Sequence, residues 1–232
     1  MKGSKKFDLS AYLVIGPENT KGRPIIPIIK DAVEAMFTCV QIRSKTASAR
    51  DLIEITCKAS DVIAQSGRAD EITLLVDDRL DVVLAARKQG AKVDGIHVGQ
   101  ADIPVDVCRY YLGKDSIIGL SARTHQLFEY IQTADVSDID YFGAGPLRET
   151  TTKPDCGIGA DGKIITRSLE EIAKLARISL IPVVVGGGVK SADIPALAQT
   201  GVGGFFVVTA VTGADNPKLA ALELVQKWRE YR

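Results

Sequence analysis

The stretch at residues 181–209, IPVVVGGGVKSADIPALAQTGVGGFFVVT, contains one full repeat of the pattern that decides the fold. It has an apolar run at residues 181–187, an amphipathic segment near 192–200, and a second apolar run at 203–209. Runs this continuous are typical of strands with both faces buried. Two such strands joined by a helix predict a βαβ crossover and therefore a parallel sheet.

The same alternation recurs along the chain and gives eight strand–helix units. Predicted strands cover residues 11–16, 38–45, 72–78, 94–99, 117–122, 140–146, 181–187 and 203–209. Predicted helices cover residues 24–37, 47–65, a segment ending at 87, 103–112, 125–133, 169–178, 192–200 and 217–231. Eight units in 232 residues predict one domain, residues 1–232, folded as a (β/α)₈ TIM barrel with its active site at the C-terminal strand ends. The alternative is an open doubly wound sheet, which the absence of GxGxxG after the first strand disfavours.

Composition excludes several classes of protein. The chain has 29 Lys+Arg and 29 Asp+Glu, so it lacks the basic excess expected of a nucleic-acid or anionic-membrane binder. No apolar run reaches the length of about 18 residues that a membrane span needs. The four scattered cysteines lack zinc-site spacing, which indicates free thiols in a reducing compartment. We therefore expect a cytoplasmic protein that acts on small molecules.

Two cations end the second predicted strand. A side-chain period of two puts Gln41, Arg43 and Lys45 on one face, and Val40 and Ile42 on the other. The apolar face is expected to meet the helices, so the polar face is expected to line the barrel interior. Cations there need anionic partners. These partners are either internal carboxylates or a bound anion such as phosphate.

Carboxylates end the next two strands. Asp77 and Asp78 close the third strand, and Asp102 follows the fourth. Such residues suit Mg²⁺, which takes a few protein oxygens and completes its shell with substrate phosphate oxygens. The alternative is that Asp78 and Asp102 cap the helices that follow them. The neighbouring cations favour a charge-balanced pyrophosphate site.

A second anion site is predicted in the same barrel mouth. The loop after the sixth strand carries hydroxyls and a lysine, the seventh strand ends in three glycines at 186–188, and the eighth ends at Val207–Ala210. Loops after strands seven and eight often bind phosphate in such barrels, and glycines let backbone N–H groups approach it. Two anion sites indicate either a sugar bisphosphate or two phosphorylated substrates. His97 fits an interior structural role as well as a catalytic one.

These motifs resemble the thiamine phosphate synthase family, and the resemblance covers essentially the whole chain. The matching segments are QIRSK at 41–45, DD at 77–78, DGIHVGQAD at 94–102, GLS at 119–121, GPLRETTTK at 145–153, GGG at 186–188 and VVTAV at 207–211. The resemblance implies transfer of an aminopyrimidine methyl group from pyrophosphate (4-amino-2-methyl-5-hydroxymethylpyrimidine pyrophosphate) to a thiazole phosphate. The products would be thiamine phosphate and pyrophosphate.

The resemblance also implies residue roles. The Mg²⁺ ligands would be Asp78 and Asp102. Pyrophosphate or metal-shell contacts would come from Arg43, Lys45, Asp77 and Lys153, with Ser121 near the reacting centre; the catalytic set would be Ser121, Lys45, Arg43 and Lys153. The pyrimidine would meet Tyr12 and Gln41, with His97 also in the substrate site. The thiazole phosphate would be held by Thr150, Thr152, Gly188, Val208 and Thr209.

Three departures from the family pattern stand out. Asp77 replaces the usual Asn and adds a negative charge, Glu149 stands where Pro is usual, and residues 205–206 are both Phe. A thiazole tautomerase-like homologue and a noncatalytic thiamine-phosphate-binding protein are the alternatives. The retained cations and carboxylates disfavour the tautomerase. The sequence does not determine the thiazole precursor or whether the loop at 154–163 closes over the substrate. It is compatible with a homo-oligomer and does not determine the oligomeric state.

Overall fold

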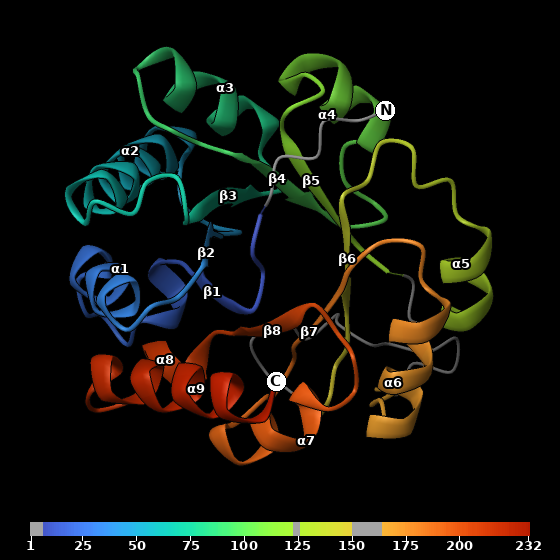
Figure 1. The fold of residues 1–232 in the computed structure, drawn as a ribbon. Helices are drawn as coiled ribbons and strands as arrows, with labels where there is room; N and C mark the ends of the chain where they lie inside the picture. Colours follow the sequence, from blue (N-terminus) through green and yellow to red (C-terminus); the bar gives the residue numbers. More distant parts are fainter. Residues whose placement is uncertain (1–6, 123–125, 150–163) are drawn as a thin grey trace.

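Eight parallel strands close into a barrel in the computed structural model, which describes residues 7–122, 126–149 and 164–232 (Figure 1). The strands are β1 (Ala11–Ile15), β2 (Cys39–Ile42), β3 (Thr73–Asp77), β4 (Gly95–Val98), β5 (Ile117–Ser121), β6 (Tyr141–Ala144), β7 (Val183–Val185) and β8 (Gly204–Val207). Consecutive strands pair, and β1 also pairs with β8. The predicted (β/α)₈ barrel is confirmed.

Helices surround the barrel, as Figure 1 shows. They are α1 (Ile25–Glu34), α2 (Ala49–Gln65), α3 (Leu80–Lys88), α4 (Val105–Leu112), α5 (Leu127–Thr133), α6 (Leu169–Ile178), α7 (Ile194–Ala198), α8 (Thr209–Thr212) and α9 (Pro217–Tyr231), with 3₁₀ turns η1 (Pro17–Asn19) and η2 (Ser191–Asp193). The sequence pattern missed α8, because its four residues are too few to show a helical period. The predicted helix at 192–200 is shorter and begins with η2.

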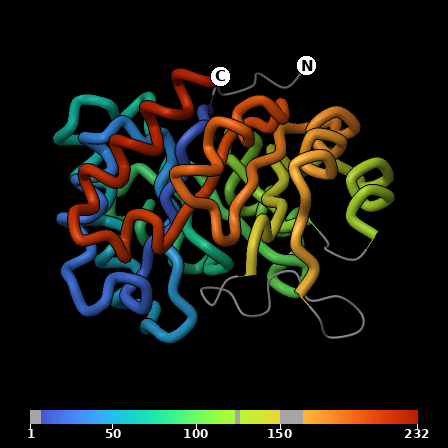
Figure 2. Tube along the Cα trace, turned by 90° about the horizontal axis from the view of Figure 1, so that it is seen from below, coloured from blue at the N-terminus to red at the C-terminus, as the bar shows by residue number. Residues whose placement is uncertain are grey.

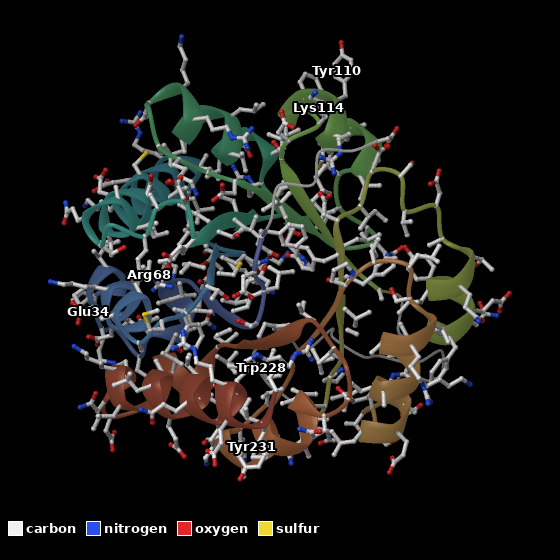
Figure 3. The ribbon with its side chains drawn as sticks, in the orientation of Figure 1. Glu34, Arg68, Tyr110, Lys114, Trp228 and Tyr231 are labelled. Carbon is white, nitrogen blue, oxygen red and sulfur yellow. The ribbon has the colours of Figure 1, made fainter. Side chains whose placement is uncertain are left out.

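The two faces of each strand bury different clusters, as the period of two predicts. Tyr12, Val14, Cys39, Leu75, Ile117, Tyr141 and Val184 belong to the cluster inside the barrel. Their neighbours in the strands, among them Leu13, Val40 and Leu74, belong to the larger cluster between the strands and the helices. Residues 205–206 divide in the same way. Trp228 of α9 is labelled in Figure 3. Phe205 packs on it with ring centroids 5.4 Å apart, whereas the Phe206 ring centroid lies 6.1 Å from that of Tyr12 inside the barrel.

The prediction that β2 continues to residue 45 is wrong. The strand ends at Ile42, so Lys45 does not face the barrel interior as a strand residue. Its side chain is 51% exposed, whereas that of Arg43 is 13% exposed. The chain leaves the sheet after Ile42 because a turn forms around Glu18 of the β1–α1 loop, as described below.

The end of the barrel at which the strands begin also holds the C-terminus, and the loops that follow the strands lie at the opposite end (Figure 2). Among the described residues no helix is long and apolar enough to cross a membrane. Cys39, Cys57 and Cys108 are free thiols, and Cys156 lies outside the described residues.

Candidate active site

An ionic cluster lies at the C-terminal ends of β2 and β3. The Arg43 Nε atom is 3.1 Å from Asp77 Oδ2, and Asp77 is only 6% exposed. The Lys45 ammonium pairs with Asp78 and lies 4.0 Å from Asp77 Oδ2. The additional negative charge of Asp77 is therefore neutralised by Arg43. Of the two partners considered for the cations, an internal carboxylate is the one that Arg43 has. Because a guanidinium has five N–H donors, Arg43 keeps others for a ligand.

Asp78 and Asp102 form a carboxylate pair across the ends of β3 and β4. The two side chains lie close enough for each to shift the pKa of the other. Burial and the charge of Asp78 raise the pKa of Asp102. Burial also raises the pKa of Asp78, but its hydrogen bonds, first that from Lys45, outweigh burial and lower the pKa overall. Ionised Asp78 thus opposes the ionisation of Asp102, and a further positive charge nearby would favour it.

Neither Asp78 nor Asp102 caps a helix, so the helix-capping alternative for these two residues is wrong. The residue before α3 is Arg79 and the residue before α4 is Pro104, and neither helix start has a side-chain cap. Asp102 instead accepts a hydrogen bond from the Gly99 backbone N at 2.8 Å. Asp78 has a φ of 59°, a left-handed conformation that Asp tolerates better than most residues.

Glu18 organises the turn that carries Lys45. Its carboxylate accepts hydrogen bonds from the backbone N of Lys45 at 3.1 Å, the Thr46 hydroxyl at 2.8 Å and the Ser44 hydroxyl. Partial burial raises the pKa of Glu18, but these hydrogen bonds, first that from Ser44, bring it down to about 2. This role was not predictable from the sequence pattern, because Glu18 and Lys45 lie on different loops.

We expect Glu18→Gln to lower the free energy of unfolding by about 1 kcal/mol near neutral pH, a value discounted for solvent screening. Because the folded-state pKa lies below the ordinary 4.5, the stabilisation by ionised Glu18 is present above pH 4.5 and is lost as the pH falls toward about 2. Urea unfolding at a series of pH values measures the difference between variant and wild type. Glu54→Gln on the outer face of α2 is the control, and a difference that persists unchanged at the lowest pH contradicts the assignment.

A continuous chain of hydrogen bonds crosses the barrel interior beside this cluster. The Gln41 amide nitrogen donates to the Tyr12 hydroxyl at 2.7 Å, and the hydroxyls of Tyr12 and Tyr141 are 3.0 Å apart. The Tyr141 hydroxyl is 2.9 Å from His97 Nδ1, and His97 Nε2 is 3.0 Å from Ser121 Oγ. Five side chains from β2, β1, β6, β4 and β5 are thus linked. Asp77 of the ionic cluster pairs in register with His97, so the ionic cluster lies beside the chain of hydrogen bonds.

Two glycines make room for this chain. A Cβ on Gly119 would lie 2.2 Å from Tyr141 Cζ, and one on Gly143 would lie 3.1 Å from His97 Cε1. Burial, and then nearby acidic groups, raise the pKa of both Tyr12 and Tyr141 well above the ordinary value. Both phenols therefore keep their protons at neutral pH. The result is a buried hydrogen-bonding network inside the barrel in which both phenols are uncharged.

The glycine turn after β7 lies against the loop after β6. The backbone N of Leu147 donates to Gly186 O at 3.1 Å, and that of Arg148 donates to Gly187 O at 3.0 Å. The Arg148 guanidinium pairs through both terminal nitrogens with Asp193 in η2. Gly188 has a φ of 74°, which favours glycine. This arrangement holds the start of the 145–153 segment, and its Thr150, Thr152 and Lys153 lie outside the described residues.

Val208 and Thr209 follow β8 at the start of α8, so the structure places them at the same end of the barrel as Gly188. The β1–α1 loop holds α8 in place. Arg23 donates to the Ala214 carbonyl at 2.8 Å and to that of Thr212, and the Thr212 hydroxyl donates to Asn19 O at 2.7 Å.

The structure thus brings nine of the predicted residues together in two groups: Arg43, Lys45, Asp77, Asp78 and Asp102, and Tyr12, Gln41, His97 and Ser121. The first is the ionic cluster, and the second is the hydrogen-bond chain. Gly188, Val208 and Thr209 belong to neither group. The sequence analysis missed Tyr141, Glu18, Arg148 and Asp193. Only Tyr141 had a usable signal, because the period of two in β6 places it on the barrel-facing side.

The chain is similar to thiamine phosphate synthases over nearly its whole length. The sequence model of the thiamine monophosphate synthase family matches residues 11–211. A thiamine-phosphate synthase of Corynebacterium efficiens is 37% identical over 226 residues, 97% of each chain, and one of Corynebacterium jeikeium is 36% identical over 228 residues, 98% of each. The solved structure of thiamine phosphate pyrophosphorylase from Pyrococcus furiosus superposes with a TM-score of 0.76 at 28% identity, covering 96% of each chain.

The closed barrel and the polar residues gathered at its C-terminal strand ends define a (β/α)₈-barrel enzyme. The residues matched by the family model span all eight strands of the barrel and include the positions of both groups of site residues. The chain belongs to the thiamine monophosphate synthase family and is a transferase of thiamine biosynthesis.

Proposed function

We propose that the chain couples 4-amino-2-methyl-5-hydroxymethylpyrimidine pyrophosphate to a thiazole phosphate and releases pyrophosphate and thiamine phosphate. The observation that carries the proposal is the adjacency of two unlike sites in one barrel mouth. Arg43 and Lys45, set among carboxylates, suit a pyrophosphate with a metal ion. The uncharged chain that includes Tyr12, Gln41 and His97 suits an aminopyrimidine ring, whose nitrogens need donors and acceptors.

The donor set at Asp78 and Asp102 fits Mg²⁺. Among the described residues no group of three or more His, Cys, Asp or Glu side chains forms a metal site by itself. Two carboxylates are nonetheless enough when substrate phosphate oxygens and water complete the shell. The raised pKa of Asp102 supports this fit, since a bound cation would favour the ionised form. When bound, Mg²⁺ would supply positive charge that neutralises the oxygens of the leaving pyrophosphate.

The reaction breaks the bond between the pyrimidine methylene carbon and a pyrophosphate oxygen, and it forms a bond between that carbon and the thiazole nitrogen. Arg43, Lys45, Lys153 and the Ser121 hydroxyl would hold the departing pyrophosphate and stabilise its growing charge. Tyr12 and Gln41 would hold the pyrimidine ring, whose amino group donates electrons to the cationic methylene carbon. Asp77 would keep Arg43 in place, 3.1 Å away. Such a reaction needs positioning and charge stabilisation rather than a covalent nucleophile.

The thiazole phosphate would bind on the opposite side of the mouth. Gly188, Val208 and Thr209 would offer backbone N–H groups, and Thr150 and Thr152 would add hydroxyls. The Arg148–Asp193 ion pair supports this assignment, because it holds the start of the 145–153 segment close to the glycine turn at 186–188. The whole chain, residues 1–232, would act as one catalytic domain.

Incubating the protein with both substrates and Mg²⁺ tests the proposal. We expect pyrophosphate and thiamine phosphate in equal amounts, and neither product when one substrate is omitted. Properly folded protein that binds thiamine phosphate without turnover would instead be a noncatalytic binding protein. Conversion of the thiazole phosphate alone, without pyrophosphate release, would favour the tautomerase-like alternative.

A further inference from the structure

The hydrogen-bond chain across the barrel has a direction, which follows from its first member. In the structure the Gln41 amide nitrogen faces the Tyr12 hydroxyl at 2.7 Å, and an amide nitrogen can only donate. Tyr12 therefore accepts from Gln41. Its own buried hydroxyl hydrogen also needs an acceptor, and the Tyr141 hydroxyl, 3.0 Å away, is in place to accept it. Each hydroxyl in such a chain accepts one hydrogen bond and donates one.

The same logic sets the proton on His97. Tyr141 accepts from Tyr12, so its hydrogen points to His97 Nδ1 at 2.9 Å. A neutral imidazole that accepts at Nδ1 carries its proton on Nε2. His97 then donates from Nε2 to Ser121 Oγ, 3.0 Å away. Ser121 accepts this bond and keeps its own hydrogen for another acceptor.

We propose that Tyr141 is a positioning residue that transmits the direction of hydrogen bonding from Gln41 to His97, so that His97 carries its proton on Nε2 and the Ser121 hydroxyl donates to bound anions. The identity of the anion as the leaving pyrophosphate rests on the proposed function. The direction of hydrogen bonding is independent of the proposed function. Burial supports the assignment. Tyr12 and Tyr141 are 2% and 0% exposed and Gln41 is 3% exposed, so water does not compete readily for these bonds.

The opposite direction would disable the site. If Gln41 presented an acceptor, Tyr12 would donate to it, Tyr141 would donate to Tyr12, and His97 would donate from Nδ1 to Tyr141. His97 Nε2 would then accept the Ser121 hydrogen, and the serine would face an anion with lone pairs only. A change at Gln41 is thus expected to alter His97 through two intervening side chains.

Nitrogen-15 NMR of histidine-labelled protein tests the proposal directly, because a protonated ring nitrogen and an unprotonated one resonate far apart. The chain has two histidines, His97 and His125, and His125→Gln identifies the His97 signals. We expect the proton on Nε2 in the wild-type protein. A wild-type proton on Nδ1 overturns the proposal without bearing on whether the enzyme makes thiamine phosphate.

Gln41→Glu supplies the reversing variant, since an ionised carboxylate only accepts hydrogen bonds. We expect the His97 proton to move to Nδ1 as spectra are recorded from about pH 6 to about pH 9, a range that ionises even a buried carboxyl with a raised pKa. The double variant with Tyr141→Phe breaks the relay and should return the proton to Nε2. Gln65→Glu, the same change on the exposed end of α2, should leave the spectrum unaltered. A Gln41→Glu spectrum with Nε2 protonated throughout overturns the proposal.

Tyr141→Phe alone should lower kcat about 10-fold with little change in KM, because it affects the orientation of Ser121 in the transition state more than substrate binding. The expected NMR change is loss of the hydrogen bond at Nδ1. An unchanged kcat together with an unchanged Nδ1 signal contradicts the positioning role. Thermal unfolding of the variant separates this effect from a general loss of folded protein.

Discussion

Asp78→Asn should lower kcat/KM for pyrophosphate release by about 100-fold or more, the equivalent of about 3 kcal/mol of transition-state stabilisation. The substitution keeps the size of the side chain but removes one of the two anionic groups in the carboxylate pair. It also removes the closer ion-pair partner of Lys45 and leaves the ammonium with Asp77, whose Oδ2 is 4.0 Å away, so Lys45 is held less firmly at the barrel mouth. Both changes weaken the neutralisation of the leaving pyrophosphate.

Turnover as a function of Mg²⁺ concentration is the measurement. The variant is expected to need more Mg²⁺ for half-maximal activity, because one carboxylate binds the cation less tightly than two. Asp81→Asn is the matched control, since Asp81 lies in the first turn of α3, three residues on, and pairs with the exposed Arg79. Wild-type activity and Mg²⁺ dependence in Asp78→Asn would refute the role assigned to this residue.

Gly204→Ala should destabilise the barrel by about 3 kcal/mol or more, among the larger effects of a single substitution. A Cβ on Gly204 would lie 1.8 Å from the Leu9 carbonyl oxygen and 2.5 Å from its carbonyl carbon. These are backbone atoms that directly precede β1, so they cannot rotate away as a side chain can. The clash falls where β8 meets β1 and closes the barrel.

The neighbouring glycine provides the control. A Cβ on Gly203 would lie 3.3 Å from the Pro182 Cβ and 3.5 Å from the Val183 carbonyl oxygen, so Gly203→Ala should cost less than about 1 kcal/mol. The midpoints of thermal and urea unfolding are the readouts, and the Gly204→Ala midpoint should fall by about 10 °C. Equal midpoints for the two variants would mean that Gly204 and the backbone of Leu9 are farther apart than the structure places them.

The architecture was predictable from the sequence because its signal is local and repeated. Each strand is a short apolar run, each is followed by an amphipathic segment, and eight repeats leave few ways to bury both faces. The alternation in β2 predicted that Gln41 faces the barrel interior and that Val40 faces the helices, and the structure places them so. Element ends were less predictable. The α8 helix and the early end of β2 depend on contacts with the β1–α1 loop, which is distant in sequence.

The candidate site divides in the same way. The positions of Arg43, Asp77 and Asp102 at strand ends followed from the sequence, because parallel strands bring their C-terminal ends to one rim. The ion pairs among these groups were not predictable from the sequence. That Asp77 meets Arg43, and that Asp78 meets both Lys45 and Asp102, depends on the left-handed backbone at Asp78 and on the turn around Glu18. The sequence pattern contains neither signal.

The sequence by itself determined the barrel, the rim on which the polar residues gather and the family to which the chain belongs, since each of these depends on residue type and spacing. Only the tertiary structure decided how those residues act on one another. The hydrogen-bond chain from Gln41 to Ser121 joins five strands, and its direction depends on atoms within about 3 Å of each other, the range over which a hydrogen bond acts. Such contacts exist only once the sheet has closed, because closure brings side chains from β1 and β6, far apart in sequence, to the same point in the barrel.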